Sequence, residues 1–358
     1  MQSRMKSFLG GAAVAVFLLS AGGADAAQDR SWTKLPPQNF DARNLVLDHV
    51  IADVTVNVRD GKGTSVQIQG PRYLVNDMHT QSGGSTVSIS GPSNDNRNFN
   101  VWDVSKWFDY SDVGEDQKVR VWVTVPRGSD VSAKHMIGDL TVGDTNGHLY
   151  VETISSDVKV GRVSDAKLKV VGGGDISVTS VQGPLSLDIA GSGDVRVGNV
   201  GGSVAITVAG SGDSSVSNIG GGLNANIAGS GDLKVGNVNG AVTISMAGSG
   251  DVSIAGGKAD PFKISMVGGG DLRFGGLAVN PTISSMGAGD VWINAYQGHL
   301  SSSGMGDVHI GKDSDNGDRH WPPAPLAPPS PPNTVSAPPA PPAPPAPPKH
   351  HHRHSDDD

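Results

Sequence analysis

The sequence contains no cysteine among its 358 residues. Disulfide bonds, thiolate metal sites and thiol catalysis are therefore excluded. Aromatic residues make up only 5% of the chain, so its core has to be built from Val, Ile, Leu and Ala. The formal net charge is −8 and the sequence has no cluster of Lys and Arg that would contact phosphates. Nucleic acid is therefore not an expected partner.

Long apolar runs are also scarce, and the clearest one stands at the N-terminus. A basic start (MQSRMK) precedes the apolar segment SFLGGAAVAVFLLSAGG and a small-x-small site at Ala24–Ala26. This order predicts a secretory signal peptide over residues 1–26. No other segment is long and apolar enough to span a bilayer. We therefore expect an exported protein without a membrane span after the signal is cleaved.

Residues 27–130 alternate apolar and polar side chains between Gly, Pro, Asn and Asp. The two-residue period is clearest at Val119, Val121, Val123 and Val125. Such alternation predicts half-buried strands, which we expect to form a β-rich segment that caps the region after residue 130. An aromatic group interrupts the pattern at Trp102, Trp107, Phe108 and Tyr110. It is either a loop that packs on the sheet or an exposed patch that stacks on sugars or other ligands.

The next region repeats one motif, in which Asp recurs every 17 to 20 residues. The aspartates are Asp139, Asp157, Asp175, Asp194, Asp213, Asp232, Asp251, Asp271, Asp290 and Asp307. So constant a period is typical of a solenoid, because each coil has to return the chain to the same corner. Two or three short strands fit in 19 residues, whereas a strand, a helix and two loops do not. The sequence predicts an all-β fold, a single-stranded right-handed parallel β-helix of about ten 19-residue rungs over residues 131–311.

The positions around each Asp repeat as well. Apolar residues follow it at the first and third places, as in Val195 and Val197, and precede the corner at alternate places, as in Leu185, Leu187 and Ile189. We expect these side chains to fill the bore of the solenoid. The paired glycines before each Asp are expected to form tight corners, since Gly reaches positive φ at little cost. The Asp carboxylate itself is expected to accept hydrogen bonds from backbone N–H groups of the turn.

Two other roles for the aspartates remain open. A column of carboxylates about 5 Å apart attracts cations, which makes Asp194, Asp213, Asp232 and Asp251 candidate metal ligands. The Gly-Ser-Gly-Asp register and the period of 19 differ from those of calcium-binding β-roll repeats. Some parallel β-helices cleave polysaccharides, but a catalytic site is needed once, whereas these aspartates recur identically. We therefore predict no catalytic residue and no cofactor.

Residues 312–358 differ in composition from the rest of the chain. Fifteen of the 23 prolines lie between Pro322 and Pro348, which predicts a disordered, extended spacer of polyproline II type. The tail ends in a histidine group that is a candidate site for Zn²⁺, Ni²⁺ or Cu²⁺, made up of His350, His351, His352 and His354. We expect Trp321 to fold over the last rung. A last rung left uncovered would offer strand edges for end-to-end or homo-oligomeric contacts.

The segment VRVWVTVPRGSDVSAKHMIGDLTV, followed by the run of Gly-Ser-Gly-Asp coils, resembles bacterial exported proteins with a GIN-type head domain, described as autotransporter adhesin heads. It is also similar to β-strand-repeat proteins of unknown function. The likeness covers about residues 40–311. It implies a repeated β fold and a surface role, and it brings no catalytic residues with it.

From these observations we expect a non-catalytic envelope or cell-surface protein, adhesin-like or scaffolding, in the periplasm, on the surface or secreted. Its partner would be a cell-envelope polysaccharide or the surface of a host or neighbouring cell. The first alternative is a cation- or polysaccharide-binding module of the periplasm. A β-helical polysaccharide lyase or hydrolase comes after it.

Overall fold

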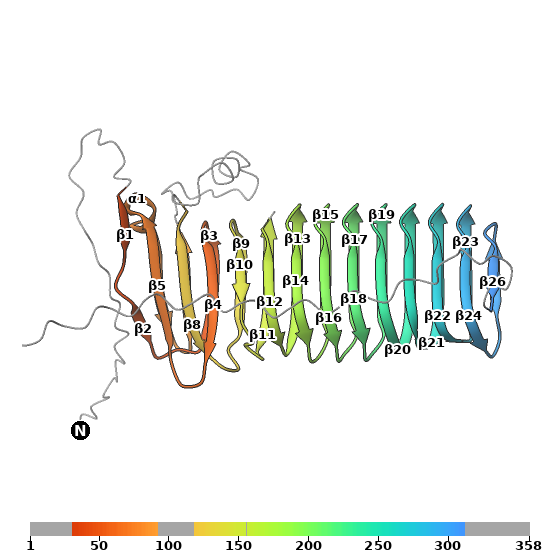
Figure 1. The fold of residues 1–358 in the computed structure, drawn as a ribbon, viewed down its shortest axis with the longest axis horizontal. Helices are drawn as coiled ribbons and strands as arrows, with labels where there is room; N and C mark the ends of the chain where they lie inside the picture. The colour runs from red at the N-terminus through yellow and green to blue at the C-terminus, as the bar shows by residue number, and fades with distance from the viewer. Residues whose placement is uncertain (1–30, 92–117, 155, 312–358) are drawn as a thin grey trace, which may run out of the picture.

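The computed structural model describes residues 31–91, 118–154 and 156–311. These residues form a parallel β-solenoid of about nine turns of about 19 residues. The strands lie side by side along the long axis, from β1 and β5 at one end to β26 at the other (Figure 1). The expected all-β parallel β-helix is thus confirmed, with about nine turns in place of ten. The expected signal peptide, the aromatic group around Trp107, and the tail with Trp321 and its histidines lie outside the described residues.

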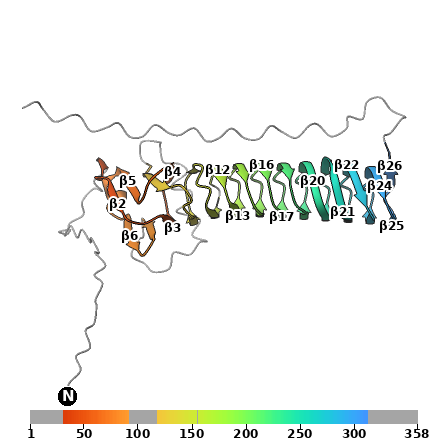
Figure 2. The ribbon, with the colours of Figure 1, turned by 90° about the horizontal axis from the view of Figure 1, so that it is seen from below.

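Each regular coil contributes one strand to each of two faces, which Figure 2 shows as two layers. Face A consists of β7 (Thr86–Gly91), β3 (Asn44–Val50), β9 (Val131–Met136), β11 (His148–Ile154), β13 (Asp165–Gly172), β15 (Leu185–Gly191), β17 (Val204–Gly210), β19 (Leu223–Gly229), β23 (Thr282–Gly287) and β25 (Ser301–Gly304). Face B consists of β8 (Arg120–Pro126), β4 (Asp53–Arg59), β10 (Leu140–Val142), β12 (Val158–Val163), β14 (Ile176–Val181), β16 (Val195–Val200), β18 (Ser214–Ile219), β22 (Leu272–Val279), β24 (Val291–Gln297) and β26 (Val308–Ile310). The long strands β20 (Leu233–Gly248) and β21 (Val252–Gly268) bend around a corner and belong to both faces.

The first coils are not stacked in sequence order. On face A, β3 pairs in parallel with β7 and with β9, and on face B, β4 pairs in parallel with β8 and with β10. The coil formed by β3 and β4 is therefore inserted between two coils that come later in the chain. This insertion brings β3 next to β9, which lies far from it in the sequence.

Antiparallel strands lie at the N-terminal edge of both faces. On face B, β5 (Thr64–Pro71) pairs with β8 and also carries β1 (Trp32–Lys34) and β2 (Gln38–Phe40). On face A, β6 (His79–Gly83) pairs with β7. A short helix, α1 (Arg72–Val75), joins these strands. Among the described residues, no helix is long and apolar enough to cross a membrane.

The core is one continuous cluster of aliphatic side chains along the bore. The inward positions expected from the repeat are confirmed, since Val195, Val197, Leu185, Leu187 and Ile189 are all at most 3% exposed. Each coil buries its apolar side chains against its neighbours, so the stability of the solenoid comes from stacking.

A column of glycines allows the corner between face A and the aspartates. Gly191, Gly210 and Gly229 have φ values of 149°, 149° and 143° and stack in register. A Cβ on Gly229 would lie 1.9 Å from the carbonyl oxygen of Gly210. The first glycine of each pair is therefore required both for its positive φ, as the sequence predicted, and for the close approach of successive coils. The second glycine, such as Gly212, is not among the residues with positive φ, and a Cβ there would lie 2.2 Å from Gly193 O.

The longest coil departs from the regular register. The step from Asp251 to Asp271 is 20 residues, and the register between β20 and β21 shifts between Gly240 and Val242. One extra residue is accommodated there as a bulge. The core continues through this coil, where the rings of Phe262 and Phe274 stack 4.8 Å apart.

Candidate functional site

The repeated aspartates form a column of hydrogen bonds that joins successive coils. From Asp175 to Asp307, the backbone N–H of each donates to Oδ1 of the aspartate one coil earlier, over 2.8 to 3.2 Å. The backbone carbonyl of the aspartate also bonds to the earlier coil, but as an acceptor: Val195 N–H donates to Asp213 O at 2.8 Å. The expected turn bond therefore exists, and it runs between coils rather than within one turn.

The column begins one coil earlier than the sequence predicted. Asp53 accepts the N–H of Asp139 at 3.1 Å, because the inserted β3–β4 coil carries the same corner. Burial raises the pKa of Asp139, and the nearby carboxylates of Asp53 and Asp157 raise it further. The hydrogen bond from the Asp157 backbone opposes this rise.

Cations of the protein itself lie beside the second carboxylate oxygen of several aspartates. Arg196 reaches Asp194 Oδ2 at 3.2 Å, and Lys234 reaches Asp232 Oδ2 at 3.7 Å. In the coils between and after them, serines occupy the same place, Ser215 and Ser253. Asp194, Asp213, Asp232 and Asp251 therefore lie in one column, as expected. Metal binding there stays a prediction, as it does for the tail histidines, which lie outside the described residues.

Face A carries two kinds of surface. Over its first coils, outward charges alternate in register in the order Asp48, Lys134, Glu152, Lys169 and Asp188. The same column continues with short neutral side chains, Thr207, Asn226, Ser245, Ser265 and Ser284. The rod is therefore charged near its N-terminal end and lined with hydroxyl and amide groups farther along.

Tyr150 and Glu152 form a hydrogen-bonded pair within the charged part. The Tyr150 hydroxyl donates to Glu152 Oε2 at 2.7 Å. This bond, with some desolvation, raises the pKa of Tyr150 to about 12. The same bond lowers the pKa of Glu152, and nearby Lys169 lowers it further.

Face B carries a second polar column next to a shallow groove. Asn218 Nδ2 donates to Asn199 Oδ1 at 2.7 Å, and Asn237 Nδ2 donates to Asn218 Oδ1 at 2.8 Å. The groove beside them has a volume of about 610 Å³ and extends from Ser180 to Asn239. It presents amide groups at regular intervals along the rod.

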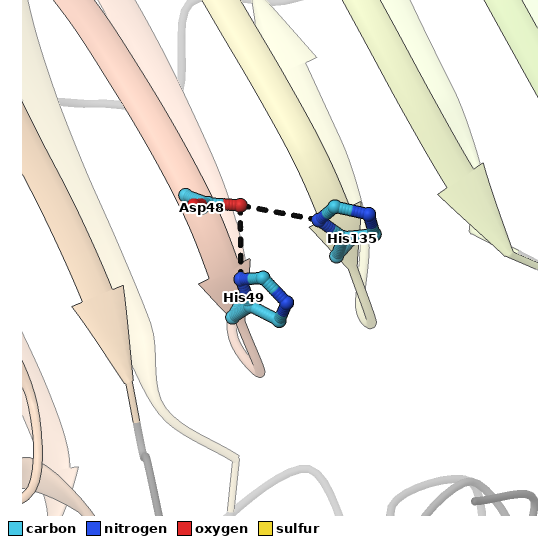
Figure 3. Close-up of side chains that lie close together, drawn as sticks. All are labelled: Asp48, His49 and His135. Carbon is cyan, nitrogen blue, oxygen red and sulfur yellow. Dashed lines mark hydrogen bonds and ion pairs between the residues drawn. The ribbon is translucent and has the colours of Figure 1, made fainter. Parts of the chain in front are cut away.

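Asp48, His49 and His135 form a cluster of potential metal-ligating side chains on face A (Figure 3). Nδ1 of His49 lies 2.9 Å from Asp48 Oδ1, and Nδ1 of His135 lies 3.1 Å from the same oxygen. The two imidazole rings stack with centroids 4.4 Å apart. The side chains are 47%, 37% and 28% exposed for Asp48, His49 and His135, so solvent reaches the cluster.

Backbone bulges place the two histidines side by side. His49 is the extra residue where the register of β3 on β7 shifts, and His135 is the extra residue where that of β9 on β11 shifts. Both have left-handed backbones, with φ of 55° and 51°. Because β3 and β9 are neighbours, with Asp48 opposite Lys134, the two bulges lie next to each other.

Sequence reasoning missed this cluster, although a signal was present. Residues 49–56 read HVIADVTV and residues 135–142 read HMIGDLTV, so the histidines occupy the same place in two copies of one coil motif. The first copy lies within residues 27–130, where the regular 19-residue period is absent, and this hides the match.

A second cluster joins Asp290, Asp307 and His309 near the C-terminal end. Asp290 Oδ1 already accepts the N–H of Asp307, and the His309 ring stacks on Trp292 at 5.3 Å. This cluster is therefore a continuation of the aspartate column.

The fold and the hydrogen-bonded column of aspartates at one corner of each coil, here called the corner column, define a β-solenoid repeat protein. The chain belongs to the family described as "Putative auto-transporter adhesin, head GIN domain", whose model matches residues 49–238 and 204–313. This confirms the resemblance seen in the sequence. At a coarse level, membership supports an adhesin-like protein that is exported or at the surface.

The chain is also similar to several solved structures of bacterial proteins. A putative adhesin from Bacteroides fragilis is 16% identical, with a TM-score of 0.35 over 79% of this chain and 98% of that one. A putative adhesin from Parabacteroides distasonis is 15% identical, with a TM-score of 0.37 over 79% and 98%. A putative lipid binding protein from Parabacteroides distasonis is 14% identical, with a TM-score of 0.36 over 79% and 96%. No curated protein matches the chain.

Proposed function

We propose that this protein is a non-catalytic, adhesin-like or scaffolding solenoid of the bacterial envelope or cell surface, and that the neutral part of face A is its binding surface. The observation that carries the proposal is the register-matched column Thr207, Asn226, Ser245, Ser265 and Ser284. A second column runs beside it, formed by Ala205, Asn224, Thr243, Lys263 and Thr282, and Lys263 is its one charged member.

The spacing of these columns suits an extended polar partner. Coils stack about 4.8 Å apart, so hydroxyl and amide groups recur at that interval over several coils. Short side chains lose little conformational entropy when they are ordered at an interface. A cell-envelope polysaccharide or the surface of a host or neighbouring cell fits such a surface. A non-catalytic role is supported by the repetition of the corner aspartates from Asp139 to Asp307, since a catalytic site is needed only once.

A polysaccharide-binding module of the periplasm is the second candidate. The groove along Asn199, Asn218 and Asn237 favours it, because the amides both donate and accept hydrogen bonds toward sugar hydroxyls. The two candidates differ in the face that binds, and a surface adhesin differs from a periplasmic module in compartment as well.

The compartment is tested by protease treatment of intact producing cells, repeated after osmotic opening of the envelope, with an antibody against residues 131–311. Digestion on intact cells supports a surface protein. Protection until the envelope is opened would contradict the surface role and leave a periplasmic scaffold or binding module.

The binding face is tested with purified cell-wall polysaccharide of the producing bacterium in a sedimentation assay. Asn226→Arg with Ser245→Arg changes two exposed residues of face A. Ser253→Arg on face B is the matched control, because Lys234 and Arg273 are its neighbours in register. We expect the face A variant to lose sedimentation and the control to keep it. Loss in Asn218→Arg instead, with face A variants unaffected, would favour the groove.

A further inference from the structure

The cluster of Asp48, His49 and His135 differs from every aspartate of the corner column in its chemistry. It combines two imidazole nitrogens and one carboxylate oxygen, and these atoms lie within 4.8 Å of one another. Both ring nitrogens point at the same oxygen, Asp48 Oδ1 (Figure 3). Imidazole nitrogen and carboxylate oxygen are both atoms that bind divalent metal ions.

We propose that Asp48, His49 and His135 bind one divalent transition-metal ion of the Zn²⁺ class. Imidazole nitrogen with carboxylate oxygen is a common donor set for Zn²⁺, and three protein ligands leave a further position for water. Hard cations such as Ca²⁺ and Mg²⁺ require several oxygen ligands, and this cluster offers one carboxylate. The proposal is independent of the proposed adhesive or scaffolding function.

The dimensions of the cluster suit such an ion after a small adjustment. With Zn–N and Zn–O bonds of about 2.0 to 2.2 Å, tetrahedral ligand atoms lie about 3.4 Å apart. The Nδ1 atoms of His49 and His135 lie 2.9 and 3.1 Å from Asp48 Oδ1. The donors have to separate by a few tenths of an ångström, which partly exposed side chains can do by rotating about their χ angles.

The backbone supports a specific role for these two histidines. Left-handed φ values of 55° and 51° are unfavourable for a residue with a Cβ, and each occurs at a bulge. Bulges re-aim side chains, and here two adjacent bulges aim two imidazoles at one carboxylate. The hydrogen-bonded column of corner aspartates passes through Asp53 and Asp139. Asp48, His49 and His135 are not part of that column.

A bound ion would fasten the inserted coil to its neighbour. Asp48 and His49 belong to β3, and His135 belongs to β9, which the chain reaches only after the intervening strands β4 to β8. Metal binding to the folded state alone would therefore raise the melting temperature.

The test uses the full chain with the five tail histidines replaced by Asn, so that they do not compete for metal. These residues are His320, His350, His351, His352 and His354. Zn²⁺ is titrated by calorimetry, and bound Co²⁺ is followed by its visible absorption. We expect one saturable equivalent of Zn²⁺, a rise in melting temperature with Zn²⁺, and no such effect with Ca²⁺ or Mg²⁺.

Two substitutions test the histidine ligands, and a third is the control. His49→Asn and His135→Asn are chosen because Asn tolerates a left-handed backbone, so the bulges can persist. Each is expected to weaken Zn²⁺ binding by more than about tenfold. Loss of a residue that only orients a metal ligand already weakens binding by about 10- to 100-fold. His148→Asn is the matched control, since His148 is also an exposed histidine of face A, paired with Asp165.

A measurement on the parent chain tests the ligands even if a variant folds poorly. ¹⁵N spectra of the imidazoles in the tail-substituted parent chain should show Zn²⁺ moving the Nδ1 signals of His49 and His135 and leaving His148 in place. Absence of saturable Zn²⁺ binding overturns the proposal. So does binding that is lost in His148→Asn or His309→Asn but kept in His49→Asn and His135→Asn.

Discussion

The backbone N–H of Asp232 donates a hydrogen bond of 2.9 Å to Oδ1 of Asp213, the equivalent residue one coil earlier. The side-chain oxygen of one coil thus accepts a hydrogen bond from a backbone N–H at the corner of the next coil. The neighbouring backbone carbonyl is satisfied by Ser214 N–H, which donates to Asp232 O at 2.8 Å. Repetition of this pair of bonds explains why the same residue recurs in every coil.

We predict that Asp213→Ala lowers the free energy of unfolding by about 1 kcal/mol, because the N–H of Asp232 loses its partner. Asp213→Asn keeps an oxygen acceptor and removes one charge from a column of carboxylates, so it should cost close to nothing. Urea denaturation of both variants measures the difference. Equal losses in Ala and Asn variants would show that charge, for instance through a bound cation, matters more than the hydrogen bond.

The glycine corner yields a prediction with a control in the adjacent residue. Gly268 has φ of 134°, and a Cβ there would lie 1.9 Å from Gly248 O. Gly268→Ala should therefore destabilise the protein by more than about 3 kcal/mol or prevent folding. A Cβ on Gly269 would meet nothing within 4 Å, and other coils have Ser or Ala at this place, so Gly269→Ala should stay within about 0.5 kcal/mol. Thermal melts of the two variants side by side decide; similar melting temperatures would refute the steric account.

Much of the solenoid could be predicted from the sequence because its physics repeats. Inward residues such as Val195 and Leu187 have the same neighbours in each coil, so one period describes them all. The corner residue Asp213 and the glycines beside it are fixed by the same geometry. A local pattern suffices wherever each coil contacts only the coils next to it in the chain.

The first coils could not be predicted because their neighbours are distant in the sequence. The β3–β4 coil lies between β7–β8 and β9–β10, and no constant period records that order. The cluster at His49 and His135 depends on this insertion and on two bulges that shift the register by one residue. A one-residue shift in a strand reverses which face a side chain occupies, and the alternation of apolar residues does not reveal it in advance.

The alternating charges of face A predict that reversing one of them destabilises the protein, and that salt reduces this effect. Lys134 lies in register between Asp48 and Glu152. Lys134→Glu replaces two attractions by two repulsions, and we expect a loss of about 1 to 2 kcal/mol at low salt. High salt should shrink that loss, because exposed charges are screened. Lys263→Glu is the control, since Lys263 lies between Thr243 and Thr282. Equal losses in both variants, unchanged by salt, would contradict the role of the charge column.

The pair of Tyr150 and Glu152 predicts two opposite limits of pH. The pKa of Tyr150 is raised from 10.0 to about 12. Its contribution to the stability of the folded state is therefore complete below pH 10 and is lost as the pH rises through 12. The pKa of Glu152 is lowered from 4.5, so its contribution is present above pH 4.5 and is lost as the pH falls through the folded value. Tyr150→Phe removes the main cause of the Glu152 shift. Carboxyl NMR titration should then show the pKa of Glu152 returning toward 4.5, and ultraviolet titration should lose the tyrosine that ionises near pH 12. Tyr296→Phe, which changes an exposed tyrosine of β24, should leave Glu152 unchanged. If the Glu152 titration is the same in Tyr150→Phe as in the parent chain, the lysines rather than the tyrosine control that carboxyl group.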